Sequence, residues 1–494
     1  MTPPAAPASK SRAHFVVADR ASDSFVVLVD ETDGSRRLPW VDDWDENLEL
    51  MRPNEPAAVA GAVGDRPLAR LGFGLPPLTI LNCWALSRRS EGDHQLIDTL
   101  YLCEPLTGDG LKVPGSARWS AGEPPVADLP VELSTALEGL AQLLKMAPSQ
   151  LPISNLPAFN LPGFSSVLAE VIANDPVAER HVVMPSADGF DPRQLTQKRG
   201  WCLSSVWLNE DFVVKLTQPA WMLEARFTTW LGQHLPDVVP EVLASGTFSV
   251  NGSAETPWFL QRRAALGEAA PGEPGRQQAA AEERTRNSKL SCLRSLAKIQ
   301  ATCLAARSEL TDLGLEDRSA QSTLQELDSL WASPDLQQLA PEERERLPSL
   351  DTILRDRLRE LHARGALALL CHGDLHLGNV IEATGGRQAI IDWTDAAFAW
   401  PGVDLLTLHG LKAEAPEARD ELVAAYAEAL SDERIIEQQN NSELVALGLS
   451  LAPIYHAISY ARIQKNLPAS LRWVFEGVVP HLVKMQLHEM ELAR

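Results

Sequence analysis

Two carboxylates and an amide lie close together in the sequence after residue 370. Asp374 is followed by Asn379 after five residues and by Asp392 after eighteen. Transfer of a phosphoryl group from a nucleotide needs a carboxylate near the proton of the attacking hydroxyl. It also needs oxygen ligands that hold a divalent cation against the phosphates. The spacing therefore predicts Asp374 as the catalytic base, with Asn379 and Asp392 as Mg²⁺ ligands.

A hairpin would hold the amide and the second carboxylate together. Apolar residues at 380–381 and 389–391 flank the Thr-Gly-Gly sequence at 384–386, and this pattern predicts two antiparallel strands joined by a turn. Such a hairpin brings both candidate metal ligands to one end of a cleft. Taken alone, the motif His372-Gly373-Asp374 is better explained by a capping aspartate in a loop. Its combination with the hairpin and the two metal ligands favours catalysis.

These motifs also carry a resemblance to a known family. The residues His372-Gly373-Asp374 with Asn379 match the pattern HGDxxxxN, and residues 391–393 supply the I-D-W that follows it. Over about residues 160–485 the chain resembles the aminoglycoside phosphotransferase and choline kinase group. The resemblance implies an α+β, bilobal protein-kinase-like fold with a small antiparallel-sheet lobe and a mainly helical large lobe. It also implies ATP (or GTP) and Mg²⁺ as cofactors.

Two polar residues of the same segment are interpreted as scaffold. Asp404 begins an apolar helical run, where a carboxylate can accept hydrogen bonds from backbone N–H groups. The resemblance implies that Asp404 braces the catalytic loop and does not react. His372 is likewise interpreted as a residue that bonds the backbone rather than as an acid or base.

A lysine and a glutamate upstream are candidates for nucleotide binding. Lys215 interrupts the apolar strand 212–216, and Glu224 follows nine residues later in the helical run 221–231. A buried lysine needs a negative partner, because an isolated buried ammonium loses its proton. We expect Lys215 to orient the α- and β-phosphates and Glu224 to hold Lys215. The alternative is a surface lysine at a strand end and an ordinary helix glutamate.

The chain has no G-x-G-x-x-G loop to cover the phosphates. Residues 200–205 stand in the corresponding place, and Ser204 and Ser205 within them combine small size with hydroxyl donors. Ser204 and Ser205 are therefore predicted to contact the nucleotide phosphates.

Composition shifts divide the chain into five parts. We expect a disordered N-terminus at 1–13, an N-terminal α/β domain at 14–146, a proline-rich linker at 147–163, a small lobe at 164–260 and a large lobe at 261–494. Within the large lobe, Cys292, Leu296, Ile299 and Cys303 recur at helical spacing, which predicts a helix face that packs in the core.

The N-terminal domain faintly resembles a Nudix fold. Residues 38–40, Leu-Pro-Trp, stand where that family turns into its catalytic helix, and Arg118-Trp119 stands in a late strand. The segment 40–46 is rich in acidic residues but lacks the R-E-x-x-E-E pattern that would hold a metal. We therefore expect a domain that is non-catalytic or presents substrate.

The whole-chain charge and cysteine content restrict the partners. The 494 residues carry a net charge of −22, which opposes binding to nucleic acid or anionic membranes and permits a cationic small-molecule acceptor. The six cysteines form no C-x-x-C pair, so we expect them to be reduced. With neither an apolar leader nor an apolar run of membrane-spanning length, the sequence predicts a cytoplasmic protein. Its oligomeric state is left open.

Three functions are compatible with these residues. The first is a small-molecule kinase that transfers the γ-phosphate to a hydroxyl. The second is a pseudokinase or ligand-binding module, which the missing glycine-rich loop would suit. The third is a protein kinase, which is disfavoured because only eleven residues separate Asp392 from Asp404 and no A-P-E motif lies among them.

Overall fold

The structure is a computed structural model of the 494-residue chain. It describes residues 9–19, 24–30, 36–37, 40–42, 78–91, 94–105, 117–122, 129–131, 133–135, 137, 179–180, 195–200, 203–249, 255–263, 277–383, 387–410, 416–435, 441–467, 472 and 474–492. The expected linker at 147–163 lies outside the described residues, as do Leu38 and Pro39 of the Nudix-like turn.

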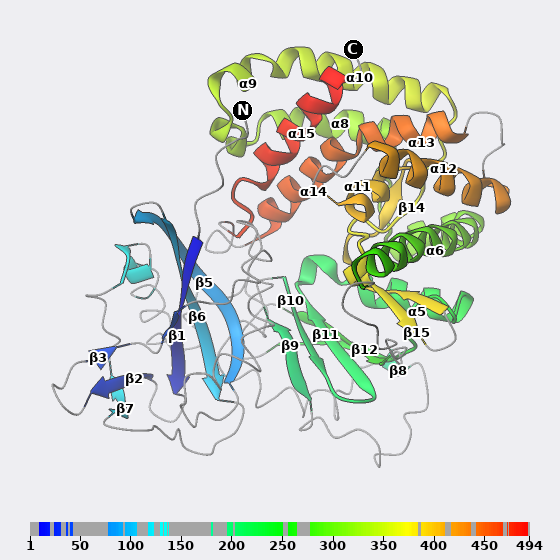
Figure 1. Ribbon diagram of the computed structural model, residues 1–494. Helices are drawn as coiled ribbons and strands as arrows, with labels where there is room; N and C mark the ends of the chain where they lie inside the picture. Colours follow the sequence, from blue (N-terminus) through cyan, green and yellow to red (C-terminus); the bar gives the residue numbers. More distant parts are fainter. Residues whose placement is uncertain are drawn as a thin grey trace. The chain divides into compact units, whose positions relative to one another are not determined.

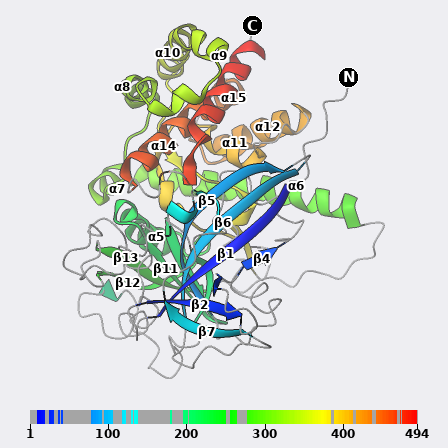
Figure 2. The same cartoon turned by 90° about the vertical axis from the view of Figure 1, so that its left-hand side faces the viewer.

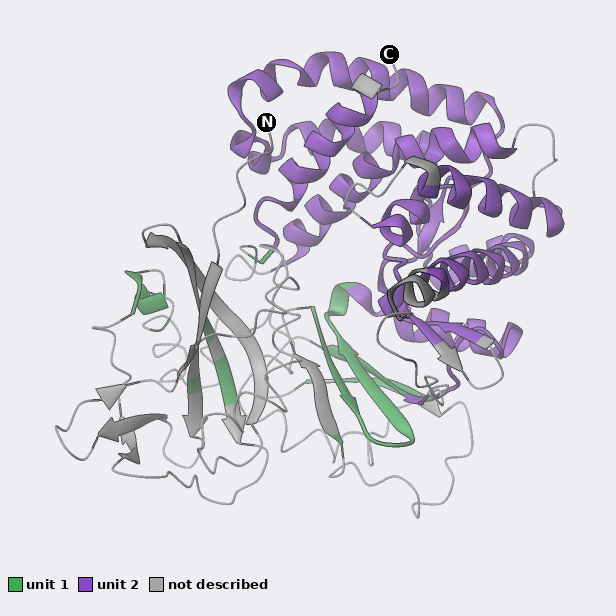
Figure 3. Cartoon of the chain, in the orientation of Figure 1, with its two compact units in different colours: residues 1–220, 243–260, 468–474 green, residues 221–242, 261–467, 475–494 purple. Residues whose placement is uncertain are grey.

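The chain divides into two compact units, which Figure 3 colours separately. Unit 1 comprises Met1–Ala220, Leu243–Leu260 and Pro468–Val474, and unit 2 comprises Trp221–Val242, Gln261–Leu467 and Phe475–Arg494. The chain passes from unit 1 to unit 2 after Leu260, where we placed the junction of the lobes. Unit 2 also takes residues 221–242, which we had placed in the small lobe. It therefore contains Glu224.

The first part of unit 1 forms a mixed sheet, in which β1, β5 and β6 are the long strands (Figures 1 and 2). Its seven described strands are β1 (Ser9–Asp19), β2 (Ser24–Asp30), β3 (Arg36–Arg37), β4 (Trp40–Asp42), β5 (Leu78–Glu91), β6 (His94–Pro105) and β7 (Ala117–Gly122). Strands β5 and β6 form an antiparallel hairpin, and β1 lies parallel to β6. Arg118 and Trp119, which we expected in a late strand, lie in β7.

Strand β1 corrects the expected disordered N-terminus. We predicted disorder through residue 13, but β1 begins at Ser9, and residues 9–13 pair with residues 95–99 of β6. The proline-, alanine- and serine-rich composition of residues 1–13 suggested disorder, because such side chains bury little apolar surface. Pairing with a neighbouring strand satisfies its backbone hydrogen bonds whatever the side chains are.

The second sheet of unit 1 is the sheet of the kinase-like part. Its order is β8-β12-β13-β11-β10-β9, with bounds β8 (Glu179–Arg180), β9 (Thr196–Gly200), β10 (Ser204–Leu208), β11 (Phe212–Thr217), β12 (Val242–Phe248) and β13 (Thr256–Arg262). Strands β9, β10 and β11 pair antiparallel in chain order. The strand predicted at 212–216 is therefore present as β11, and it carries Lys215.

Unit 2 is mainly helical among its described residues. Its helices are α5 (Leu223–His234), α6 (Gln277–Ala305), α7 (Arg307–Leu313), α8 (Ala320–Trp331), α9 (Pro341–Glu345), α10 (Leu347–Ala363), α11 (Val403–His409), α12 (Pro416–Asp432), α13 (Asn441–Ser450), α14 (Ala452–Asn466) and α15 (Val478–Leu492). Two short antiparallel pairs lie among them, β14 (Leu369–Cys371) with β17 (Ala397–Ala399) and β15 (Val380–Ala383) with β16 (Arg387–Ile390).

The helices of unit 2 bury the apolar faces that their sequences present. The predicted stripe on α6, from Cys292 to Cys303, is fully buried at all four positions. It joins one core with residues of α5, α11, α12 and β14. Helices α6 and α12 are also joined by a buried hydrogen bond, which Tyr426 donates to Gln300 at 2.8 Å. This core is the support on which the candidate site rests.

None of the described helices is by itself long and apolar enough to cross a membrane. Helices α13 and α14 reach that length and composition only as a pair, which bends by 44° at their junction.

Candidate active site

Asp374 lies in the loop that follows β14, and its side chain is 48% exposed. Its backbone is held on both sides. The N–H of Asp374 donates to Nδ1 of His372 at 3.3 Å, and its carbonyl accepts from Nδ2 of Asn379 at 2.9 Å. Nε2 of His376 lies 3.7 Å from Oδ2 of Asp374. The carboxylate is thus accessible from solvent while the peptide beneath it is fixed, as a catalytic base requires.

Asp404 braces this loop from the first turn of α11. It is 4% exposed. Its Oδ2 accepts from the N–H of His372 at 3.0 Å, and its Oδ1 accepts from the N–H of Gly373 at 2.9 Å and from Sγ of Cys371 at 3.1 Å. The scaffold role predicted for Asp404 is confirmed, because each of these three hydrogen bonds joins its carboxylate to residues 371–373.

His372 links the loop to the strand that leads to Asp392. Nδ1 accepts the Asp374 N–H, so the ring carries its proton on Nε2, which donates to the carbonyl of Ile391 at 2.9 Å. Complete burial lowers the pKa of His372, although the nearby Asp404 carboxylate acts in the opposite direction. His372 is therefore a neutral scaffold residue, as the sequence predicted.

Asn379 and Asp392 are held on adjoining backbone segments by the predicted hairpin. Strands β15 and β16 pair Val380 with Ile390, although the turn at 384–386 lies outside the described residues. The N–H of Ile391 donates to the carbonyl of Asn379 at 2.9 Å. Ile391, which directly precedes Asp392, is thus hydrogen-bonded to Asn379, the other candidate metal ligand.

Asp392 adopts a strained backbone conformation, with φ of 66° and ψ of 59°. It is one of two described non-glycine residues with positive φ, a conformation that aspartate tolerates better than most residues. Strain of this kind gathers at functional sites. The left-handed turn leads into a single 3₁₀ turn, η8 (Trp393–Asp395).

Thr394 in that turn was missed by the sequence reasoning. Its hydroxyl lies 2.5 Å from Oδ1 of Asp392 and 2.9 Å from Oε2 of Glu224. Glu224, in the first turn of α5, is 2% exposed. Nothing in the local sequence signals this contact, because 170 residues separate Thr394 from Glu224. Residues from two distant segments of unit 2 therefore meet beside the candidate metal ligand.

Trp393 supplies the apolar part of the same junction. Its indole packs edge-on against Phe227 of α5, with ring centroids 5.6 Å apart, and lies 4.6 Å from the ring of His372. Its Nε1 donates to the carbonyl of Ile390 at 3.0 Å. The tryptophan of the I-D-W motif thus connects α5, the catalytic loop and the end of β16.

Of the nucleotide-binding residues predicted in the small lobe, Lys215, Ser204 and Ser205 belong to unit 1, whereas Glu224 belongs to unit 2. Lys215 is 8% exposed and pairs in register with Val206. Ser204 and Ser205 begin β10, and both are buried. Oγ of Ser205 accepts from the indole Nε1 of Trp207 at 2.8 Å. This bond gives Ser205 a packing role, and the Lys215–Glu224 pair and the phosphate contacts of both serines stay predictions.

The side chains of Asn379 and Asp392 suit Mg²⁺. Hard divalent cations bind oxygen, and Mg²⁺ is usually held by one or two protein ligands together with water and substrate phosphates. Because Nδ2 of Asn379 donates to the Asp374 carbonyl, its Oδ1 is turned the other way and can serve as the ligand. Among the described residues no three His, Cys, Asp or Glu side chains gather as a metal cluster. A carboxylate and an amide completed by a nucleotide are a different donor set.

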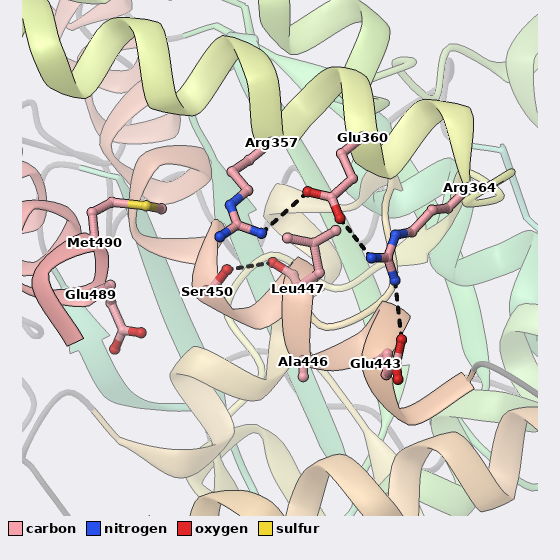
Figure 4. A pocket seen from close by; sticks show the side chains of 9 residues that line it. All are labelled: Arg357, Glu360, Arg364, Glu443, Ala446, Leu447, Ser450, Glu489 and Met490. Atoms are coloured by element: carbon pink, nitrogen blue, oxygen red, sulfur yellow. Dashed lines mark hydrogen bonds and ion pairs between the residues drawn. The ribbon is translucent and has the colours of Figure 1, made fainter. Parts of the chain in front are cut away.

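A separate cavity of about 330 Å³ lies between α10, α13 and α15 (Figure 4). None of the predicted site residues lines it. Its charged groups are already paired, since Glu360 accepts from Arg357 and Arg364, and Arg364 also donates to Glu443. We therefore do not assign the chemistry to this cavity.

Comparison with known proteins agrees with this geometry. Residues 198–438 match the phosphotransferase enzyme family (APH). The family resemblance drawn from HGDxxxxN and I-D-W is thereby confirmed, and so is the kinase-like fold. The matched segment contains every predicted site residue. The Nudix-like resemblance of the N-terminal domain stays a prediction.

Several solved structures are similar to the chain. Macrolide 2'-phosphotransferase MphH from Brachybacterium faecium is 18% identical, with a TM-score of 0.36, over 64% of this chain and 98% of that one. Choline kinase LicA from Streptococcus pneumoniae is 13% identical, with a TM-score of 0.37, over 65% and 98%. A glucosamine kinase is 17% identical, with a TM-score of 0.35, over 67% and 82%. No curated protein sequence matches the chain significantly.

Proposed function

We propose that this protein is a small-molecule kinase that transfers the γ-phosphate of ATP or GTP to a hydroxyl of a small, hydroxylated acceptor. The observation that carries the proposal is the joining of three groups by hydrogen bonds. Asn379 bonds the carbonyl of Asp374 through its side chain and the N–H of Ile391 through its backbone. The candidate base and both candidate metal ligands are thus parts of one hydrogen-bonded unit.

Each residue has a task in the proposed reaction. The exposed carboxylate of Asp374 orients the acceptor hydroxyl and takes its proton as the oxygen attacks phosphorus. Asn379 and Asp392 hold Mg²⁺, which when bound neutralises charge on the nucleotide phosphates. Lys215 orients the α- and β-phosphates, with Glu224 as its partner, and Ser204 and Ser205 approach the phosphates from the start of β10.

The segment after Asp392 favours a small acceptor over a protein. Residues 393–409 are occupied by η8, β17 and α11 with short connections, so no extended segment is left there to seat a peptide. The net charge of −22 suits a cationic acceptor and opposes nucleic acid or an anionic membrane as partner. An enzyme that consumes ATP or GTP acts where these nucleotides are held, so the proposal includes a cytoplasmic location.

A pseudokinase or nucleotide-binding module is the alternative, and phosphate transfer separates the two, while Asp374→Asn tests the assignment of the base. Purified protein is first screened for Mg²⁺-dependent ADP or GDP release against hydroxylated amines and sugars, and the phosphorylated product is identified by mass. Asp374→Asn should lower turnover by about 10² to 10⁴ and change nucleotide affinity less than about threefold. Asp432→Asn, an exposed position on α12, is the matched control and should turn over like the wild type.

Two results would count against this assignment. Nucleotide binding without transfer to any acceptor would favour the binding module. Turnover by Asp374→Asn at the rate of the wild type would remove Asp374 as the base.

A further inference from the structure

Two carboxylates face a single hydroxyl between α5 and η8. Oδ1 of Asp392 and Oε2 of Glu224 lie 2.5 and 2.9 Å from Oγ1 of Thr394. A hydroxyl has one proton to donate, whereas an ionised carboxylate can only accept. The two carboxylates therefore share one donor, and the shorter contact indicates that the proton points toward Asp392.

This contact is fixed by the packing around it. Glu224 is 2% exposed on α5, and Trp393, beside Thr394, is 1% exposed and packs edge-on against Phe227 of the same helix. A shift of α5 would carry Glu224 and Phe227 with it. Since the Thr394 hydroxyl lies within hydrogen-bond distance of both carboxylates, such a shift would also change the hydrogen bond that orients Asp392.

We propose that Thr394 is a positioning residue, which couples the position of α5 to the orientation of the Asp392 carboxylate and so to Mg²⁺ binding. The inference rests on the proposed function, because it takes Asp392 as a metal ligand. In this role Thr394 acts through Asp392 and is not itself a metal ligand. Its hydroxyl holds Oδ1 of Asp392 and thereby sets the rotation of the carboxylate that receives the ion.

The test compares three variants by a binding measurement that needs no catalysis. Mn²⁺ replaces Mg²⁺, and its affinity for the protein–ADP complex is measured by electron paramagnetic resonance and by calorimetry. Thr394→Val keeps the shape of the side chain and removes the donor, whereas Thr394→Ser keeps the donor. Thr229→Val is the matched control, because Thr229 lies on α5 and its hydroxyl donates to the Ala225 carbonyl at 2.8 Å.

Loss of an outer-shell partner of a metal ligand typically costs 10- to 100-fold in metal affinity. We expect Thr394→Val to weaken Mn²⁺ binding by roughly that factor, and Thr394→Ser and Thr229→Val to stay within about threefold of the wild type. Glu224→Gln tests the coupling. If Thr394 acts between the two carboxylates, Thr394→Val should weaken binding less in the Glu224→Gln background than alone, because residues of one network are not additive.

The outcomes separate this inference from the function beneath it. If the wild type and Thr394→Val bind Mn²⁺·ADP equally well, the positioning role is overturned and the kinase proposal stands. A melting temperature lowered by Thr394→Val with unchanged Mn²⁺ affinity would show a purely structural hydroxyl and would also overturn it. Wild-type protein without Mn²⁺·ADP binding would reject the proposed function and this inference with it.

Discussion

Replacing Asp404 by asparagine should loosen the catalytic loop while keeping its shape. The Asp404 carboxylate accepts three donors, the N–H groups of His372 and Gly373 and the thiol of Cys371. An amide has one accepting oxygen. If that oxygen keeps the two bonds now made by Oδ1, the NH₂ group faces the N–H of His372, and two donors then oppose each other in a buried site.

The magnitude follows from this single lost bond. A hydrogen bond to a charged group contributes about 1.5–3 kcal/mol, and a buried donor without a partner costs about 1–3 kcal/mol. Removing a buried charge returns part of that sum, because its desolvation is no longer needed. We therefore expect Asp404→Asn to lower the free energy of local opening by about 3 kcal/mol, which corresponds to roughly 100-fold faster amide exchange in the loop.

Hydrogen exchange read by mass spectrometry on a peptide spanning residues 369–380 measures this directly. Asp317→Asn is the control. Asp317 is 54% exposed, accepts from the Ser319 N–H at 2.9 Å and pairs with Arg307, so its loss should cost under about 1 kcal/mol. Exchange in the Asp404→Asn loop that differs from wild type by less than threefold would refute the bracing role.

Two more predictions concern stability. Gly448→Ala should destabilise the fold by about 1–3 kcal/mol or more, since its Cβ would collide with the Pro401 carbonyl. Gly232→Ala on α5, whose Cβ would lie 3.8 Å from Val239, should stabilise the fold by about 0.5–1 kcal/mol. Chemical denaturation measures both free energies of unfolding, and equal effects of the two substitutions would contradict both predictions. Burial lowers the pKa of His456 to about 4, so below pH ~6.5 the unfolded chain binds a proton that the folded chain takes up only near pH 4. The free energy of unfolding therefore falls as the pH falls through that window, by up to about 3 kcal/mol. Denaturation at pH 7 and pH 4.5 should show a smaller loss of stability for His456→Gln than for the wild type. An equal loss would remove His456 as the cause.

Local patterns in the sequence predicted much of this architecture. The β15–β16 hairpin follows from two apolar runs around glycines, and the buried face of α6 follows from Cys292 to Cys303 at helical spacing. The scaffold role of Asp404 followed from its place at a helix start and from the family resemblance. The first two signals are local, because the backbone geometry of a single helix or strand fixes which of its side chains share a face.

The contacts that the sequence did not predict join segments far apart in the chain. Thr394 meets Glu224 across 170 residues, and Trp393 meets Phe227 across a comparable separation. A threonine after I-D-W carries no periodicity, and its partner is set only when α5 packs on the core of unit 2. The strand at Ser9 was missed for the same reason, because its pairing partner lies in β6.

Gly373 allows the loop of Asp374 to lie close to the turn that follows Asp392, although the two aspartates are eighteen residues apart in the sequence. Its φ is +84°, and a Cβ at this position would lie 2.5 Å from the carbonyl oxygen of Asp395 and 2.7 Å from the Asp395 Cβ. No side chain fits there, and an L-residue would in addition be strained at that φ. The glycine of H-G-D thus lets the loop that carries Asp374 lie directly against the turn that carries Asp392. A larger residue at 373 would push the two apart, and the candidate base Asp374 and the candidate metal ligand Asp392 would no longer share one support.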